Sequence, residues 1–359
     1  MRFSIFGDRH YSRRSKRADL IIDTWKWAID DSKRRGAHMI VGVGDVCEGD
    51  PDGYERWILG GVYAHANPLR RVEVLGNHCA HEALLWLEYL GVEHVWNTIT
   101  YLPMSPGTLV LVPYARYGRP PFDVPLHMAQ TLCTQIVEQA IRTALDDPKW
   151  TRPVILIAHM TPEGATTRST RFEVHRTGEL VIPRAVYGLA DLAVFAHIHK
   201  PQDDPLVVGS QTRIDFDEAD DAKRYLIVET HPDGRVTWES CPIQGRQMVE
   251  KRLTWVPGMT IAPEEIETFR GTDTKLVIDI PASMAGTYRE QALDPIRDVA
   301  ASLTIDPRPE TVERIRAPEI MEARTLPAEV DVWLRTTNLG VDRAALAPIL
   351  EELELEIQE

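Results

Sequence analysis

Hydrophobic positions along the first part of the chain fall into two alternating patterns. Short uninterrupted apolar runs such as VILIA and LAVFA predict strands buried on both faces, and longer segments with apolar residues three or four apart predict amphipathic helices. The predicted strands cover residues 2–6, 38–43, 71–75, 108–113, 153–158 and 192–196. The predicted helices cover residues 16–35, 54–66, 81–90 and 124–145. Regular alternation of these elements is typical of a layered α/β domain.

The pattern changes after residue 206, where the sequence favours β-hairpins. The segment KRYLIVETHPDGRVTWES places a Pro-Asp-Gly turn between two alternating runs. We therefore predict a domain boundary near residues 243–246, with a larger domain over 1–245 and a smaller C-terminal α+β domain over 246–359. In the smaller domain, strands are predicted near 249–256 and 275–280 and helices near 287–302 and 344–353.

Composition limits the class of protein. The 359 residues are 43% hydrophobic and 26% charged, which is ordinary for a folded globular chain. No apolar run reaches the length of about 18 residues that a membrane span requires, and the chain starts without an apolar signal segment. The four cysteines are far apart and form no C-x-x-C pair, which favours free thiols in a reducing compartment. We therefore expect a cytoplasmic protein.

The net charge of −14 opposes nucleic-acid binding at long range. Any binding to DNA must then be local, assisted by metal ions, or shared with a partner protein. The negative net charge also argues against nonspecific binding of polyanions by the whole surface.

Seven side chains of metal-ligand type follow the predicted strands directly. Each group comes after an apolar run that ends in glycine or alanine, which is how buried strands deliver polar residues to one edge of a sheet. Single motifs such as D-x-H or G-D occur often by chance, but here all of them appear in order along the chain. The seven residues are Asp8, His10, Asp45, Asn77, His159, His197 and His199.

This set of ligands suits a pair of divalent cations. Two ions about 4 Å apart can hold both the attacking and the leaving oxygen of a phosphodiester, and they need an anionic ligand between them. We expect Asp45 to be that ligand, because a carboxylate has two oxygens to divide between the ions. The mixture of oxygen and imidazole donors suits Mn²⁺, Fe or Zn²⁺ better than Mg²⁺ or Ca²⁺. His197 and His199 can each complete either ion's ligand set.

His78 follows Asn77 and is not needed as a ligand. A histidine at this position can protonate a leaving oxygen or stabilise developing charge. We expect Glu48, three residues after Asp45, to orient the His78 imidazole, since a carboxylate fixes its tautomer. The alternative for Glu48 is a solvated carboxylate on a loop.

A basic stretch lies between the first ligands and the first predicted helix. Basic residues at a helix N-terminus oppose the helix dipole, so Arg13, Arg14 and Arg17 are interpreted as contacts to a DNA phosphate backbone. Tyr11 and Ser12, next to His10, are expected to touch the same backbone. A solvated helix start is the alternative interpretation.

The series D-x-H, G-D, G-N-H, H and H-x-H resembles the calcineurin-like metallophosphoesterases. Three longer stretches resemble the SbcD nuclease subunit, the bacterial and phage form of the double-strand-break repair nuclease. The resemblance covers residues 1–229 and extends less closely to residue 280. These stretches are DRHYSRRSKR, GSQTRIDFDEADDAKRYLIVE and RQMVEKRLTW.

The resemblance implies a two-sheet sandwich flanked by helices, with a C-terminal capping domain that carries a partner-docking helix. It implies two Mn²⁺ ions, with Fe, Zn or Mg as alternatives, and a single-strand endonuclease and 3′-to-5′ exonuclease that works in DNA repair and recombination. It implies an SbcC-type coiled-coil ATPase as partner and a homodimer formed through residues 54–66 and 81–90. It places Asp8, His10, Asp45 and His199 around one ion and Asp45, Asn77, His159 and His197 around the other, with His78 catalytic and Glu48 supporting it.

Three positions depart from that family's pattern. Cys79 follows G-N-H where an acidic residue is usual, and Glu48 replaces an aspartate. Ala196 replaces the glycine before H-x-H, and because alanine adopts positive φ less readily, we expect a shifted turn there. The alternatives are another calcineurin-like phosphoesterase, acting on nucleotides or phosphoproteins, and a non-catalytic scaffold of the same fold.

Overall fold

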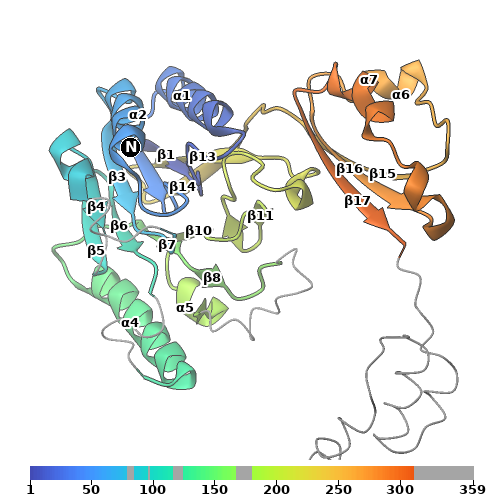
Figure 1. Ribbon diagram of the computed structural model, residues 1–359. Helices are drawn as coiled ribbons and strands as arrows, with labels where there is room; N and C mark the ends of the chain where they lie inside the picture. The colour runs from blue at the N-terminus through green and yellow to red at the C-terminus, as the bar shows by residue number, and fades with distance from the viewer. Residues whose placement is uncertain (79–84, 96–97, 116–123, 167–179, 311–359) are drawn as a thin grey trace, which may run out of the picture. The chain divides into compact units, whose positions relative to one another are not determined.

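The computed structural model describes residues 1–78, 85–95, 98–115, 124–166 and 180–310 (Figure 1). Its contacts divide the chain into two compact units. The larger unit contains Met1–Lys251, Ile261–Lys275 and Asp294–Thr304, and the smaller one contains Arg252–Thr260, Leu276–Leu293 and Ile305–Glu359.

Two six-stranded sheets form the body of the larger unit. The first has the order β14-β13-β1-β2-β3-β4. Strands β1 to β4 run parallel to one another, and β13 pairs antiparallel with both β1 and β14. Its strands are β1 (Arg2–Phe6), β2 (Met39–Val43), β3 (Arg70–Val74), β4 (Glu93–Val95), β13 (Arg224–Thr230) and β14 (Val236–Pro242).

The second sheet has the order β11-β12-β10-β7-β6-β5. Its three central strands β10, β7 and β6 are parallel, with Ala196 opposite His159 in register. The strands are β5 (Thr100–Met104), β6 (Gly107–Val112), β7 (Val154–His159), β10 (Leu192–Ala196), β11 (Gln202–Asp203) and β12 (Leu206–Val207).

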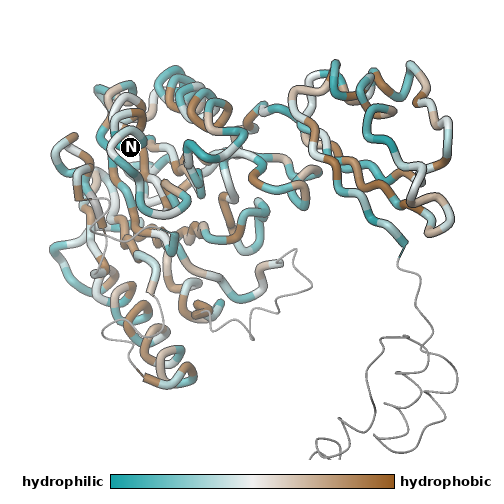
Figure 2. The backbone as a smooth tube through the Cα atoms, in the orientation of Figure 1, coloured by the Kyte–Doolittle hydropathy of each residue, from teal (hydrophilic) through white to brown (hydrophobic). Residues whose placement is uncertain are grey.

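The two sheets pack face to face, and helices cover their outer faces. One hydrophobic core joins residues of both sheets, such as Val41 and Ile157. A second core packs α1 (Ala18–Arg34) and α2 (Gly53–His65) against the first sheet, and a third packs α4 (Leu126–Asp146) against the second. Hydrophobic and hydrophilic segments alternate along α1 and α4, as expected of helices with one buried face (Figure 2). The result is a layered order of helix, sheet, sheet and helix.

The remaining elements are a third sheet, a pair of two-residue strands and several short helices. A three-stranded sheet has the order β15-β16-β17, from β15 (Met248–Thr254), β16 (Asp273–Ile280) and β17 (Ser302–Pro309). Strands β8 (Thr161–Pro162) and β9 (Val181–Ile182) form a parallel pair. The short helices are α5 (Arg184–Tyr187), α6 (Pro263–Glu267) and α7 (Asp294–Arg297), with 3₁₀ turns η1 (Leu85–Leu90), η3 (Phe216–Glu218), η4 (Ala282–Thr287) and η5 (Glu290–Leu293).

The mixed α/β class predicted from the sequence is confirmed. The helix predicted over 287–302 is wrong, because this stretch holds 3₁₀ turns and the short α7 before entering β17. The helix predicted over 81–90 is a 3₁₀ turn from Leu85, and residues 79–84 lie outside the described part of the chain, as does the helix predicted near 344–353. The proposed boundary near 243–246 stays a prediction. No helix among the described residues combines the length and the apolar character needed to cross a bilayer.

Truncating a side chain between the sheets is expected to destabilise the larger unit strongly. Ile157 is fully buried in the inter-sheet core, so Ile157→Ala should lower the free energy of unfolding by about 2–5 kcal/mol. Ile136→Ala on α4, where the side chain is partly exposed, is the matched control and should change it by less than about 0.5 kcal/mol. Equal losses for the two variants in denaturant titrations would contradict the assignment of the core.

Candidate metal centre

The seven predicted ligands meet at the carboxyl ends of parallel strands from both sheets. Asp8 and His10 follow β1, Asp45 follows β2, and Asn77 comes after β3. From the second sheet, His159 is the last residue of β7, and His197 and His199 follow β10. Because both sheets present these ends at one rim, residues far apart in the sequence come together.

Their ligand atoms form overlapping clusters. In each cluster, one atom from every residue lies within 4.8 Å of the others. The clusters are Asp8–His10–His199, His10–Asp45–His78 and Asp45–His159–His197. Asn77 joins the last of these, since its Oδ1 lies 3.0 Å from His159 Nε2 and 2.9 Å from His197 Nδ1.

Asp45 connects the two halves of the centre through a single oxygen. Its Oδ2 lies 3.6 Å from His10 Nε2 and 3.3 Å from His159 Nε2. Its Oδ1 instead accepts a hydrogen bond of 3.0 Å from the backbone N–H of His78. The expectation that the two oxygens divide between the ions stays a prediction: the short contacts to both ligand sets are made by Oδ2, and the His78 N–H holds Oδ1.

Charge around Asp45 favours its ionised form. Burial alone would raise the pKa of this carboxyl, but the His159 and His10 rings and the His78 N–H lower the pKa overall. For His159, burial lowers the pKa while Asp45 and Asp8 raise it, to about 9 overall. The carboxylates of the centre thus attract positive charge into a nearly dry site.

The hydrogen bonds of the His159 ring indicate where a cation would bind. The Nδ1–H of His159 donates to the carbonyl oxygen of Val43 at 2.7 Å, which can only accept. Without a metal ion, the raised pKa keeps a proton on Nε2, where it faces the oxygens of Asp45 and Asn77; when that proton leaves, the Nε2 lone pair faces the same oxygens. Acceptors facing one another repel unless a cation lies among them, so this set fits a metal ion.

His10 and His199 are also oriented by acceptors at their Nδ1 atoms. Their Nδ1 atoms face the carboxylates of Glu48 at 2.6 Å and Glu218 at 2.7 Å, so each Nδ1 carries the hydrogen. Their Nε2 atoms then point at each other across 3.0 Å, near Asp8 and Asp45. Carboxylates that orient ligand imidazoles in this way are typical of metal sites.

Backbone strain is concentrated at this rim. The non-glycine residues with positive φ in the described part of the chain are His10 (47°), Asp45 (41°) and His197 (85°). This conformation is costly for such residues and persists only where the surroundings enforce it. The expected shift at Ala196 is corrected, because Ala196 ends β10 and the left-handed residue is the next one, His197.

Two glycines leave room for the ligands. A Cβ atom at Gly44, where φ is +87°, would lie 1.9 Å from Nδ1 of His159. A Cβ atom at Gly76 would lie 2.1 Å from Oδ1 of Asp45. Any side chain at these positions would therefore displace a ligand.

Glu48 contacts two histidines. Its Oε1 lies 3.0 Å from His78 Nδ1, as expected, and its Oε2 lies 2.6 Å from His10 Nδ1, which the sequence analysis did not anticipate. The His10 contact lowers the pKa of Glu48 most, against the opposing effect of partial burial. This carboxylate therefore links a candidate ligand to the candidate proton donor.

A second supporting group was also missed. Glu218 Oε2 accepts from Ser210 Oγ at 3.1 Å and pairs with Lys223 Nζ at 2.7 Å, and Lys223 also donates to the His199 carbonyl. Burial raises the pKa of Glu218, but His199 and Lys223 lower it to about 2. The serine, the acidic run and the lysine were visible in the sequence, but their distances from His199 along the chain gave no sign of contact.

Arg9 anchors the first ligand motif from the opposite side of β1. The guanidinium is fully buried and makes two bonds of 2.7 Å to Glu73 on β3. Tyr63 of α2 donates to the same carboxylate at 2.9 Å, and Trp25 of α1 lies 4.6 Å from the guanidinium carbon. Residues that alternate along an extended chain point to opposite faces, so Asp8 and His10 face the rim while Arg9 faces the helices.

The residues predicted to contact DNA lie in different surroundings, and DNA binding itself stays a prediction. Tyr11 is buried in the core beneath α1 and α2, so its ring cannot touch DNA in this structure. Arg17 is also buried, 3.3 Å from an Asp273 oxygen, so it is corrected from a surface contact to an internal one. Arg13 and Arg14 are exposed, although Arg13 pairs with Asp52 at 2.9 Å.

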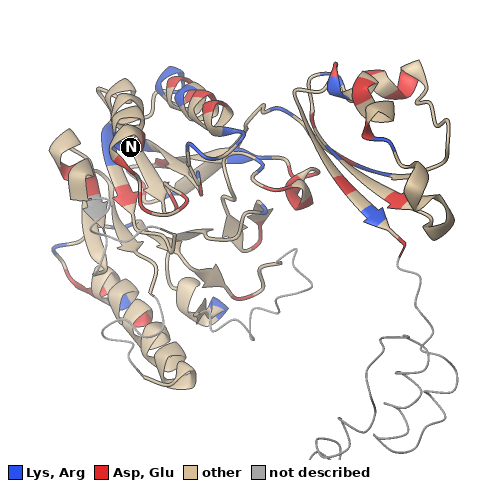
Figure 3. Ribbon diagram, viewed as in Figure 1, with Lys and Arg blue, Asp and Glu red and all other residues tan. Residues whose placement is uncertain are grey.

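Of the three arginines, only Arg17 lies at the N-terminus of α1, as its N-cap residue. Helix α1 begins at Ala18, so Arg13 and Arg14 lie in the turns before it, and Ser12 is partly buried with its Oγ 3.5 Å from Glu55. Acidic and basic residues are interspersed along α1 and form no continuous basic face (Figure 3).

Comparisons with known proteins identify no family. No protein-family model and no curated protein matches the chain. Among solved structures, a dimetal phosphatase from Danio rerio is similar over 67% of this chain and 96% of its own, at 12% identity and a TM-score of 0.38. Values this low leave the geometry of the centre as the basis for its interpretation.

Replacing Asp45 is expected to weaken the whole centre. Because one oxygen serves both ligand sets, Asp45→Asn should reduce Mn²⁺ affinity at both sites by at least about 100-fold, since even supporting partners contribute about 10–100-fold. Isothermal titration calorimetry on metal-stripped protein measures this effect. Asp217→Asn, at an exposed position in η3, is the control and should bind like wild type; a variant Asp45→Asn that still binds two ions tightly would exclude the shared ligand.

Loss of the Glu73 charge is expected to destabilise the fold. Glu73→Gln leaves Arg9 buried without a counter-charge and should lower the free energy of unfolding by about 3–5 kcal/mol. Glu93→Gln is the matched control, because Glu93 pairs in the same two-bonded way with Arg70 on the neighbouring strand but is exposed, and it should cost at most about 1 kcal/mol. Similar chemical denaturation midpoints for both variants would argue against this role of the buried pair.

Proposed function

We propose that this chain is a metal-dependent phosphoesterase and, within that class, a manganese-dependent DNA nuclease subunit with 3′-to-5′ exonuclease and single-strand endonuclease activity. The observation that supports the class is the position of Asp45 Oδ2 between two sets of nitrogen and oxygen ligands. The finer assignment depends on the sequence stretches that resemble the SbcD subunit.

The residues at the rim form two sets of metal ligands. Asp8, His10, Asp45 and His199 would hold one cation, and Asp45, Asn77, His159 and His197 the other. When bound, the two cations supply the charge that orients a phosphodiester and stabilises its transition state.

His78 is placed to handle a proton. Its ring packs edge-on against His10, with centroids 4.5 Å apart, and its side chain is 35% exposed at the rim. Because Nδ1 faces Glu48, Nε2 is the atom that can deliver a proton to a departing oxygen. Glu48 keeps this ring in one orientation.

The acidic chain needs help to hold DNA. With a net charge of −14, long-range attraction is absent, and Arg13 and Arg14 offer only a local contact. We propose that an SbcC-type coiled-coil ATPase supplies additional DNA contacts. We also propose a homodimer through α2 and η1, which expose Trp57 (70%) and Tyr89 (91%).

The same acidic charge favours a second candidate. A phosphoesterase that acts on nucleotides or phosphoproteins needs no polyanion-binding surface, and it would use the same metal ligands. A small chromogenic phosphodiester would not separate the two activities, whereas degradation of single-stranded or hairpin DNA would. Co-purification with a long coiled-coil ATPase, followed by a manganese-dependent nuclease assay with and without ATP, tests the finer proposal.

Removing the His78 imidazole should slow the chemical step without emptying the centre. His78→Ala is expected to lower kcat on single-stranded DNA by about 10²–10⁴-fold while Mn²⁺ binding stays within a few fold of wild type. His38→Ala, at an exposed position on the loop before β2, is the control and should retain full activity. If His78→Ala cleaves DNA at the wild-type rate, the proposed proton transfer is wrong. If the wild-type protein cuts no DNA with any of the metals tested, the nuclease assignment is wrong.

A further inference from the structure

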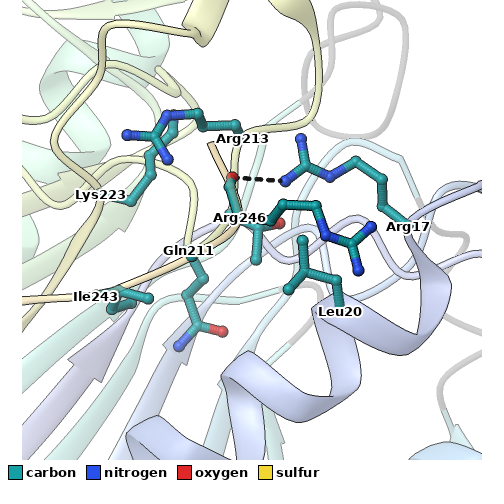
Figure 4. A pocket seen from close by; sticks show the side chains of 9 residues that line it. Arg17, Leu20, Gln211, Arg213, Lys223, Ile243 and Arg246 are labelled. Atoms are coloured by element: carbon teal, nitrogen blue, oxygen red, sulfur yellow. Dashed lines mark hydrogen bonds between the residues drawn. The ribbon is translucent and has the colours of Figure 1, made fainter. Parts of the chain in front are cut away.

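A basic cavity lies behind the metal centre, between the start of α1, the 211–213 loop and the segment after β14 (Figure 4). It is a small hollow that is partly open to solvent. Its polar lining consists of Arg17, Gln211, Thr212, Arg213, Lys223 and Arg246. All of these residues belong to the larger unit.

Several buried polar atoms at this cavity lack hydrogen-bond partners among the described residues. Gln211 is 1% exposed, yet both Oε1 and Nε2 of its amide are unsatisfied. Arg17 is 7% exposed, and its Nη1 is likewise unpaired, as are Thr212 Oγ1 and Arg213 Nε. Buried polar atoms normally have partners, so a group of them around one space indicates a missing ligand.

The cavity also carries excess positive charge. Lys223 is neutralised by Glu218 at 2.7 Å and Asp221 at 3.3 Å. Arg17 and Arg246 share one carboxylate, that of Asp273, which lies 3.3 Å from Arg17 Nε and 3.2 Å from Arg246 Nη1. Burial and the like charges of Arg246 and Arg213 lower the pKa of Arg17, which shows that its charge is incompletely compensated.

We propose that this cavity binds the phosphate group of a small molecule, either inorganic phosphate or a mononucleotide. A phosphate offers several oxygen acceptors and up to two negative charges, which match the unpaired arginine N–H groups, the Gln211 amide and the Thr212 hydroxyl. Water could fill some of these bonds but would leave the charge of the arginines unbalanced. In Figure 4, the side chains of Arg17 and Arg246 lie on one side of the cavity, and the Arg213 guanidinium lies on the other side, near Lys223.

The site shares a wall with the metal centre. The backbone N–H of Gln211 donates to the Asp8 carbonyl at 2.9 Å, and Lys223 donates to the His199 carbonyl at 3.1 Å. A bound anion is therefore one residue away from two candidate ligands. The proposal nevertheless stands apart from the proposed catalysis, because its donors are not ligands of the centre.

The test uses metal-stripped full-length protein, so that phosphate cannot bind to metal ions. Thermal unfolding and isothermal titration calorimetry are followed with inorganic phosphate and, separately, with AMP, at constant ionic strength set with chloride. We expect saturable binding and a rise in Tm with at least one of them. Tighter binding of AMP identifies a nucleotide as the ligand, and equal binding identifies phosphate.

Three variants locate the binding. Arg213→Gln and, independently, Arg246→Gln should weaken it by about 10-fold or more, the usual effect of one charged hydrogen bond. Arg14→Gln is the matched control on the exposed turn before α1 and should bind within about twofold of wild type. Asp45→Asn should also bind normally. Wild-type protein that shows no saturable binding, arginine variants that bind like wild type, or loss of binding in Asp45→Asn would each overturn the proposal.

Discussion

The shared carboxylate of Asp45 determines how the rest of the centre is built. Its Oδ2 faces imidazole nitrogens from both sheets, while the His78 N–H holds Oδ1. A carboxylate so placed must stay ionised in a buried site, and the surrounding rings make that possible. The face-to-face packing of the sheets therefore serves the site as well as stability, because it brings the ends of β2 and β7 together at Asp45 Oδ2.

Three of the ligand imidazoles are held by groups outside the centre. Glu48 and Glu218 fix two imidazoles from outside the centre, and the Val43 carbonyl fixes a third. Lys223 then compensates the charge of Glu218. At His10, such a contact accompanies a positive φ angle, a backbone conformation that persists only where the surroundings enforce it.

Much of the fold and the ligand set could be predicted because both follow from local patterns. Uninterrupted apolar runs marked the central strands, and ligand types directly after them marked the rim. The supporting shell could not be predicted in this way. Glu218 contacts His199 from a 3₁₀ turn, and Glu73 contacts Arg9 from another strand of the sheet. The sequence separation of each pair therefore matches no helical or strand repeat. Tyr11 and Arg17 looked accessible because the sequence does not reveal how the turn before α1 folds inward.

The group formed by Arg9, Glu73, Tyr63 and Trp25 has a consequence for how this protein can vary. It connects α1 and α2 to the tripeptide that carries Asp8 and His10. A change of size or charge at one of the four positions leaves the other three mismatched, so their effects combine non-additively. Among homologous chains, these four residues should therefore be exchanged as a set, even though none of them belongs to the ligand motifs.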